Sequence, residues 1–131
     1  MIEKYIHGRE LTVGVVNNQS LDVIELVTKK KFYDYKSKYT KGLTEYIIPA
    51  KIPKAIEEKC KEYALKIHKY LKCTGVTRTD FRFDQKDLKK IRLYVLEINT
   101  QPGMTPLSLV PKMAKHKGIS FDELIKKIIS D

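Results

Sequence analysis

The most constraining feature of this chain is a strand pattern that ends in a tight turn at residues 96–105. Apolar and polar side chains alternate into this stretch, which predicts a β-strand. Successive side chains of a strand point to opposite faces, so Val95, Glu97 and Asn99 are expected to share one face. A carboxylate and an amide oxygen then lie together at the strand's end, and Gly103 lets a ligand approach the backbone beside them.

Oxygen donors of this kind are the ligands that Mg²⁺ prefers, together with phosphate oxygens. A second alternating run, residues 76–83, places Arg78 and Asp80 on the face opposite to Phe81. If the two runs pair as a hairpin, Asp80 lies within cross-strand reach of Glu97. Neighbouring carboxylates repel each other unless a cation neutralises them, which favours a metal site. A pair of solvated acids at a strand end is the alternative that the pattern leaves open.

Length and composition favour one soluble domain or a part of one. The chain has 131 residues, and 42% of them are hydrophobic, as in an ordinary globular protein. Without a membrane-spanning apolar run or the apolar core of a signal peptide, it is expected to be cytoplasmic, with no membrane partner. Cys60 and Cys73 lack metal-ligand spacing and are expected to be reduced thiols.

The net charge of +10 indicates affinity for anions, but it does not choose among nucleic acid, a membrane surface and a polyphosphate such as ATP. Residues 29–42 concentrate six lysines and three tyrosines. Such a segment suits a loop that closes over phosphates, a surface that stacks bases, or a solvated loop. The residues themselves leave these three interpretations open.

The pattern as a whole predicts an α+β protein with an antiparallel sheet of about five to six strands and helices packed on one face. The strands are expected at residues 1–6, 10–16, 21–28, 43–48, 76–83 and 91–99. A strand at the very start of the chain has no earlier element to pair with. This suggests a piece of a longer protein.

Three helices are expected in the remaining segments. The longest covers residues 53–71, and its predicted buried stripe consists of Ile56, Cys60, Ala64, Ile67 and Leu71. His68 is expected at its surface or half-buried. A short helix ends near Gly118, and Ser120 with Glu123 forms a capping box for a terminal helix. The residues of that terminal helix predicted to face inward are Leu124, Ile125, Ile128 and Ile129.

Several short motifs occur in a defined order. The most specific is EINTQPGMT at residues 97–105, followed by SLVP at residues 108–111. The others are EKYI at 3–6, GRELTV at 8–13, FYDY at 32–35, KY at 38–39 and RTD at 78–80. Together they resemble the C-terminal part of the D-alanine–D-alanine ligases, a family of the ATP-grasp superfamily. The resemblance covers essentially the whole chain.

The resemblance implies a nucleotide site. Glu3 would contact adenine through its side chain. The backbone of Lys4, Tyr5 and Ile6 would also face adenine. Glu10 would hold the ribose hydroxyls. Lys38 would meet the γ-phosphate of ATP, and Tyr39 beside it would close over the site.

It also implies the groups that act on the phosphates and on the second substrate. The residues implied to bind two Mg²⁺ ions, for which Mn²⁺ is an alternative, are Asp80, Glu97 and Asn99. Arg78 and the backbone N–H of Gly103 would stabilise the tetrahedral intermediate. Ser108 and Leu109 would receive the carboxylate of the second D-alanine.

The implied reaction is the ATP-dependent joining of two D-alanines for peptidoglycan precursors, through an acyl phosphate of the first D-alanine. Phosphoryl transfer needs positioning and charge neutralisation, which Mg²⁺ and Lys38 suit. Displacement of phosphate by the second amine needs preorganised donors, which Arg78 and a glycine N–H suit. Tyr39 favours a dipeptide product over a depsipeptide.

The family's N-terminal domain and the first part of its ATP-grasp region have no counterpart in this sequence. Residues 1–131 are therefore expected to be a C-terminal ATP-grasp fragment that carries half of a site and is inactive alone. The full-length protein is expected to be a homodimer that binds ATP and D-alanine and no nucleic acid.

The alternative from another class is a non-catalytic, basic nucleic-acid-binding domain. It is supported by the +10 charge and the lysine- and tyrosine-rich segment. It leaves Asp80 and Glu97 without a role, and the lysines are spread along the chain instead of forming one stripe. An ATP-grasp ligase for other substrates and a purely structural role are further alternatives.

Overall fold

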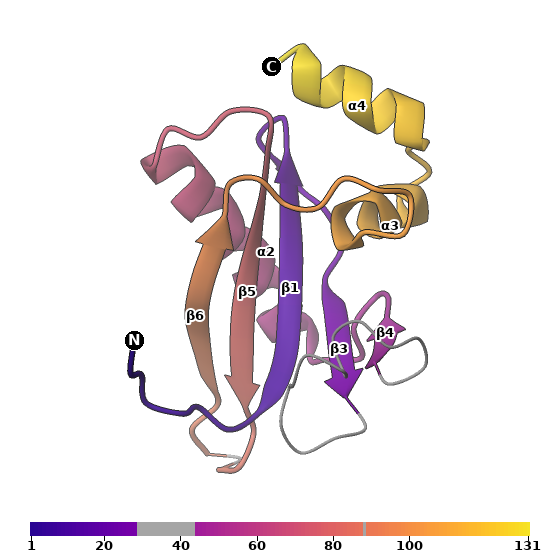
Figure 1. Ribbon diagram of the computed structural model, residues 1–131. Helices are drawn as coiled ribbons and strands as arrows, with labels where there is room; N and C mark the ends of the chain where they lie inside the picture. Colours follow the sequence, from indigo (N-terminus) through magenta and orange to yellow (C-terminus); the bar gives the residue numbers. More distant parts are fainter. Residues whose placement is uncertain (29–43, 88) are drawn as a thin grey trace.

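The computed structural model describes residues 1–28, 44–87 and 89–131, and it is an α+β structure (Figure 1). The helices in these ranges are α2 (Lys54–Tyr70), α3 (Leu109–His116) and α4 (Phe121–Ile129). The strands are β1 (Arg9–Val16), β2 (Gln19–Ser20), β3 (Ile24–Thr28), β4 (Thr44–Ile47), β5 (Val76–Asp84) and β6 (Arg92–Asn99). None of the described helices is both long enough and apolar enough to cross a membrane.

All strand pairs in the described sheet are antiparallel. The strand order is β4-β3-β1-β5-β6, with β2 paired to β1 in addition. Eight consecutive residues of β1 pair with β5, from Arg9 opposite Phe83 to Val16 opposite Val76. The predicted hairpin of β5 and β6 is confirmed, and Asp80 lies directly opposite Glu97. β5 and β6, which carry Asp80 and Glu97, are therefore neighbouring strands, and β6 is an edge strand of the sheet.

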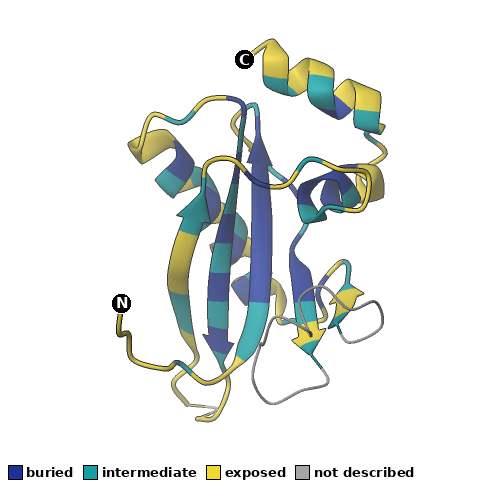
Figure 2. Ribbon diagram, in the orientation of Figure 1, coloured by how far each residue is buried: buried dark blue, intermediate teal, exposed yellow. Residues whose placement is uncertain are grey.

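The two faces of the sheet differ in chemistry. One face carries Leu11, Val13 and Val15 of β1, which form a buried core with α2. Along β5, buried and half-buried residues alternate, and Figure 2 shows this as dark and light bands. Residues of β1 and β5 that point the other way include charged ones. We call the face formed by Glu10, Thr12, Gly14, Arg78, Asp80 and Arg82 the polar face.

The helices do not all pack on one face, in contrast to the prediction, although the α+β class is confirmed. α2 covers the apolar face, whereas α3 covers one end of the polar face, above Gly14. A Cβ atom at Gly14 would lie 3.2 Å from Sδ of Met113 and 3.3 Å from Val110, both in α3. The absence of a side chain at Gly14 lets this helix approach the strand, and Asp22 holds its far end through His116 Nδ1 at 2.8 Å.

Residues 1–7 form no strand, so the strand predicted at 1–6 is wrong. The first strand begins at Arg9, and its two sides are already occupied by β3 and β5, which leaves the preceding segment no free strand edge on β1. Gly8 brings this segment close to β5. It adopts a φ of +134°, and a Cβ atom there would lie 2.3 Å from the carbonyl oxygen of Phe83.

A β-bulge in β6 changes the predicted face of Val95. Asp80 pairs with Glu97 and the next residue, Phe81, pairs with Val95, so Leu96 is an extra residue between the two pairs. Glu97 and Asn99 therefore share the polar face as predicted, whereas Val95 lies on the opposite side. The alternation of apolar and polar residues in the sequence does not reveal this bulge, because the extra residue, Leu96, is apolar like its neighbour Val95.

The buried stripe of α2 differs from its prediction at the C-terminal end. Ile56, Cys60 and Ala64 are buried as expected, but His68 continues the stripe and is fully buried. Leu71, which caps the helix, is 51% exposed. The expectation of a surface or half-buried histidine is wrong because His68 points at β5, where its Nδ1 lies 2.8 Å from Oγ1 of Thr77.

The capping box of α4 is confirmed, since Oγ of Ser120 accepts a hydrogen bond from the N–H of Glu123 at 3.2 Å. Leu124 is buried in the second core, which α3 and α4 share. Ile129 is 77% exposed, in contrast to its prediction, and it is the last residue of the helix.

Burial of His68 predicts a pH-dependent stability. Removal of this imidazole from water lowers its pKa below 6.5, although Asp131 opposes the effect. The unfolded state therefore binds a proton that the folded state does not, and the free energy of unfolding should fall as the pH drops below about 6.5, by at most about 1.4 kcal/mol per pH unit. Urea unfolding between pH 7.5 and pH 5 measures this slope.

The matched comparison uses two histidine variants. His68→Gln should flatten the slope in this pH range, whereas His7→Gln, at an exposed position, should leave it unchanged. An identical slope in His68→Gln and the unmodified chain would show that another group causes the pH dependence.

Candidate functional site

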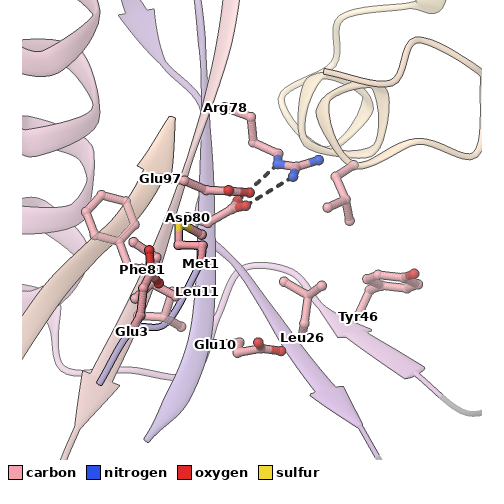
Figure 3. Close-up of a pocket in the computed structure, with 12 residues that line it drawn as sticks. Met1, Glu3, Glu10, Leu11, Leu26, Tyr46, Arg78, Asp80, Phe81 and Glu97 are labelled. Carbon is pink, nitrogen blue, oxygen red and sulfur yellow. Dashed lines mark hydrogen bonds and ion pairs between the residues drawn. The ribbon is translucent and has the colours of Figure 1, made fainter. Parts of the chain in front are cut away.

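A cavity of about 470 Å³ opens on the polar face, between the N-terminal segment and the strands (Figure 3). Its lining combines apolar walls with several charged groups. The lining residues are Met1, Glu3, Glu10, Leu11, Leu26, Tyr46, Arg78, Asp80, Phe81, Leu96, Glu97 and Leu109. A volume of this size suits a small-molecule ligand.

The lining of this cavity is acidic, although the chain carries a net charge of +10. It contains the carboxylates of Glu3, Glu10, Asp80 and Glu97, and Arg78 is the one basic side chain among the described lining residues. Four carboxylates around one arginine repel a bare polyanion and attract a cation. The charge of the cavity therefore points to a metal ion or a metal-bound anion.

Arg78 and Asp80 form a bidentate ion pair in the site. The guanidinium Nε donates to Oδ1 of Asp80 at 3.0 Å, and Nη2 donates to Oδ2 at 3.1 Å (Figure 3). Both side chains come from the polar face of β5, two residues apart. Thr12 of β1 adds a third hydrogen bond, because its hydroxyl donates to Oδ1 of Asp80 at 2.7 Å. Thr12 is only 1% exposed, so a buried hydroxyl group helps to orient the carboxylate of Asp80.

Glu97 and Asn99 stand opposite Asp80 and Arg78, respectively, in the hairpin. Glu97 is exposed, and its carboxylate has no hydrogen bond or ion pair to another residue in the described part of the chain. Asn99 is oriented by the turn that follows, since its Oδ1 accepts a hydrogen bond from the N–H of Gln101 at 2.9 Å. The predicted cross-strand reach between Asp80 and Glu97 is confirmed, and Asn99 lies beside them on the hairpin without lining the cavity.

The patch formed by Asp80, Glu97 and Asn99 provides only some of the ligands that Mg²⁺ needs. Among the described residues there is no cluster of three His, Cys, Asp or Glu side chains that could hold a metal ion. Two carboxylates and one amide oxygen are the hard donors available, and Mg²⁺ takes further ligands from water and substrate phosphates. The residues present therefore fit a metal that arrives with a phosphate ligand, and not a closed structural metal site.

Glu10 lies on β1 opposite Arg82 of β5. Its Oε1 atom is 3.1 Å from Nη2 of Arg82, and the two side chains are 24% and 18% exposed, respectively. Burial raises the pKa of the Glu10 carboxyl, the charge of Arg82 opposes this, and the charge of Asp80 adds to it. An oriented, half-buried acceptor therefore faces the cavity beside the Asp80 patch.

The turn after β6 brings Gly103 next to the start of α3. A Cβ atom at Gly103 would lie 3.1 Å from Oγ of Ser108, so this position needs a glycine or a shift of the serine. Ser108 Oγ accepts a hydrogen bond from the N–H of Thr105 at 3.0 Å and lies 2.8 Å from the hydroxyl of Thr105. Leu109, the first residue of α3, lines the cavity.

Not all predicted site residues are placed at the cavity. Glu3 lines it, but Lys4 and Tyr5 are exposed and Ile6 is half-buried, and none of these three is a lining residue. Lys38 and Tyr39 lie within residues 29–43, outside the described ranges. The role predicted for each of these residues stays a prediction.

The sequence analysis assigned no role to three polar neighbours of the site, Thr12, Arg82 and Tyr46. Thr12 follows Glu10 by two residues, so the strand period of β1 could have placed it on the same face. Arg82 follows Asp80 in the same way. Tyr46 of β4 could not have been found by spacing, because its position depends on strand order; its ring lies 4.0 Å from Nζ of Lys112 in α3.

Comparisons with known proteins identify the family to which the chain belongs. A family model described as D-ala D-ala ligase C-terminus matches residues 1–130. The D-alanine–D-alanine ligases of Erythrobacter litoralis and Rhizorhabdus wittichii are 51% and 49% identical to the chain over 98% and 100% of its residues. The chain spans only 40% and 42% of the length of these two relatives.

Solved structures give the same result. The crystal structure of the D-alanine–D-alanine ligase from Bacillus anthracis complexed with ATP has a TM-score of 0.78 and 34% identity, and the match covers 98% of this chain and 40% of that one. The VanG D-Ala:D-Ser ligase from Enterococcus faecalis has a TM-score of 0.78 at 31% identity, over 97% of this chain and 37% of that one. With a family model that matches nearly every residue, the chain belongs to the family of D-Ala–D-Ala ligase C-terminal domains.

Proposed function

We propose that this chain supplies the Mg²⁺- and nucleotide-binding C-terminal part of a D-alanine–D-alanine ligase, an ATP-dependent carboxylate–amine ligase of peptidoglycan precursor synthesis. The observation that carries the proposal is the pairing of Asp80 with Glu97, beside Arg78, in an acidic cavity of a basic chain. Relatives named for this activity support it, although the chain spans about 40% of their length.

Asp80, Glu97 and Asn99 would hold Mg²⁺ at the phosphates of ATP. The bound metal would neutralise phosphate charge and orient the γ-phosphoryl group. Asp80 is preoriented for this task by the hydroxyl of Thr12 and the guanidinium of Arg78. Glu97 has its carboxylate free among the described residues, which leaves both of its oxygens for a metal.

The nucleoside would lie along the other wall of the cavity. Glu10 would accept hydrogen bonds from the ribose hydroxyls, and Glu3 with the backbone of residues 4–6 would meet adenine. Leu26 and Phe81 contribute apolar surface between these groups. Lys38 and Tyr39 would approach the γ-phosphate, as the family resemblance implies.

Arg78 and Gly103 would stabilise the oxyanion that forms when the second amine attacks the acyl phosphate. Arg78 lines the cavity while two of its nitrogens are held by Asp80, so its position is fixed before substrate arrives. Preorganised donors of this kind are the largest single contribution to many acyl transfers.

Ser108 and Leu109 would receive the carboxylate of the second D-alanine. They form the start of α3, where the first backbone N–H groups of a helix lack intrahelical acceptors and favour an anion. The similar VanG structure is that of a D-Ala:D-Ser ligase. We propose D-alanine as the second substrate because the two curated relatives above are named for it and because, as the resemblance implies, Tyr39 favours a dipeptide product.

The nucleic-acid-binding alternative fits this cavity poorly. Its four carboxylates would repel a phosphate backbone, and binding that depends on lysines alone would weaken steeply with salt and would need no Mg²⁺.

The proposal predicts Mg²⁺-dependent binding of ADP that is lost in Asp80→Asn and Glu97→Gln. Each substitution removes a carboxylate ligand, and loss of even a supporting partner at a metal site costs about 10–100-fold, so the Mg²⁺-dependent affinity should fall at least about tenfold. NMR titration of the chain with ADP, with and without Mg²⁺ and at high salt, measures this.

Glu62→Gln is the control, because Glu62 is an exposed carboxylate on α2 with 64% of its side chain accessible. Its affinity should equal that of the unmodified chain. Diffuse, Mg²⁺-independent shifts on lysines would instead favour the polyanion interpretation. No ADP binding at all would contradict a nucleotide site in this chain.

The chain by itself should not ligate D-alanine. It spans 40% of the length of the relative from Erythrobacter litoralis, and the family resemblance implies that the first D-alanine subsite is built by an N-terminal domain that has no counterpart in these 131 residues. An assay of D-alanine-dependent phosphate release should therefore give only background. Release above the level of Asp80→Asn would show that these 131 residues contain a complete active site.

A further inference from the structure

Arg82 contacts three parts of the chain that surround the proposed nucleoside wall. Its Nη2 atom lies 3.1 Å from Oε1 of Glu10, and its Nη1 atom donates to the carbonyl oxygen of Gly8 at 3.3 Å. Its guanidinium carbon also lies 5.8 Å from the ring centroid of Tyr5, within the range of a cation–π contact. One side chain therefore joins the segment before β1, the start of β1 and the C-terminal part of β5.

The segment that Arg82 contacts has no strand pairing to hold it. Residues 1–7 lie outside the sheet, and most of their side chains are exposed. Gly8 passes so close to the Phe83 carbonyl that the chain crosses β5 at a fixed point. Arg82 adds two contacts from the sheet to this segment, one to the carbonyl oxygen of Gly8 and one to the ring of Tyr5.

Arg82 is not itself a lining residue of the cavity, so it acts on a ligand through its neighbours. Its Nε atom is buried and has no hydrogen-bond partner among the residues that the structure describes. A buried donor without an acceptor costs stability, and an apolar side chain of similar length would avoid this cost. The arginine is therefore poorly explained as a packing residue and better explained by the groups that it orients.

We propose that Arg82 is a positioning residue for nucleoside recognition: it fixes the carboxylate of Glu10 and ties the 3–8 segment to β5, so that the ribose and adenine contacts form together. This inference rests on the proposed function, and it goes beyond it by assigning a role to a residue outside the cavity. It predicts that loss of Arg82 weakens recognition of the ribose hydroxyls specifically.

The experiment compares ADP with 2′,3′-dideoxy-ADP, both with Mg²⁺, by calorimetric titration of the 131-residue chain. The quantity measured is the dissociation constant of 2′,3′-dideoxy-ADP divided by that of ADP. This ratio reports only on contacts to the ribose hydroxyls. Glu10→Gln gives the ratio expected when the direct contact is weakened. Arg82→Met should lower the ratio towards that of Glu10→Gln, about tenfold below the unmodified chain, by weakening ADP while changing dideoxy-ADP little.

Two further variants separate positioning from general effects. Arg82→Lys keeps the charge but cannot contact Glu10 and Gly8 with a planar fork, so its ratio should lie between those of Arg82→Met and the unmodified chain. Arg92→Met removes an exposed arginine from the neighbouring strand and should leave the ratio unchanged. Thermal unfolding of each variant accompanies the titrations, and a stability loss without a change in ratio counts as a structural role.

The outcomes distinguish the two proposals. If Glu10→Gln lowers the ratio and Arg82→Met leaves it at the value of the unmodified chain, the role of Arg82 is overturned and the nucleotide site stands. If Arg82→Met weakens both nucleotides equally, Arg82 has a structural role and the inference is again overturned. If the unmodified chain does not bind ADP, the proposed nucleotide site fails, and the inference fails with it.

Discussion

The antiparallel pairing of β1 with β5 is the constraint on which the rest of the structure depends. It runs over eight residue pairs without a bulge, so the two strands keep the same alternation along their whole contact. One face of both strands is consequently buried, largely through apolar side chains packed against α2, and the other collects Glu10, Thr12, Asp80 and Arg82. A slip of one residue would exchange the two faces and bury these charges.

Local signals in the sequence were sufficient for most elements, and they failed where position depends on distant strands. The hairpin of β5 and β6 could be predicted because both strands alternate and a polar turn joins them. The contact of Thr12 with Asp80 could not, since it requires the register between strands that are far apart in the chain. The bulge at Leu96 was hidden because an apolar residue fits either face of an edge strand.

The candidate site was predictable to a similar degree. Asp80 and Glu97 lie within cross-strand reach as expected, because they occupy matching positions of one hairpin. The residues at the start of the chain were predicted as a strand on composition alone, yet both edges of β1 are taken. His68 was misplaced for another reason: a histidine in an otherwise apolar stripe is buried here because Thr77 offers it a hydrogen bond across the core.

Two arginines on one strand have different surroundings, because only Arg78 lines the cavity. Arg78 faces the cavity and neutralises Asp80 directly, but one guanidinium cannot balance four carboxylates, and a divalent cation would supply the missing positive charge. Arg82 lies behind the lining and balances Glu10, whose burial and proximity to Asp80 would otherwise favour its neutral form. Because Arg82 neutralises Glu10, the negative charge that remains facing the cavity is concentrated at Asp80 and Glu97. A phosphate-bound metal would be held there.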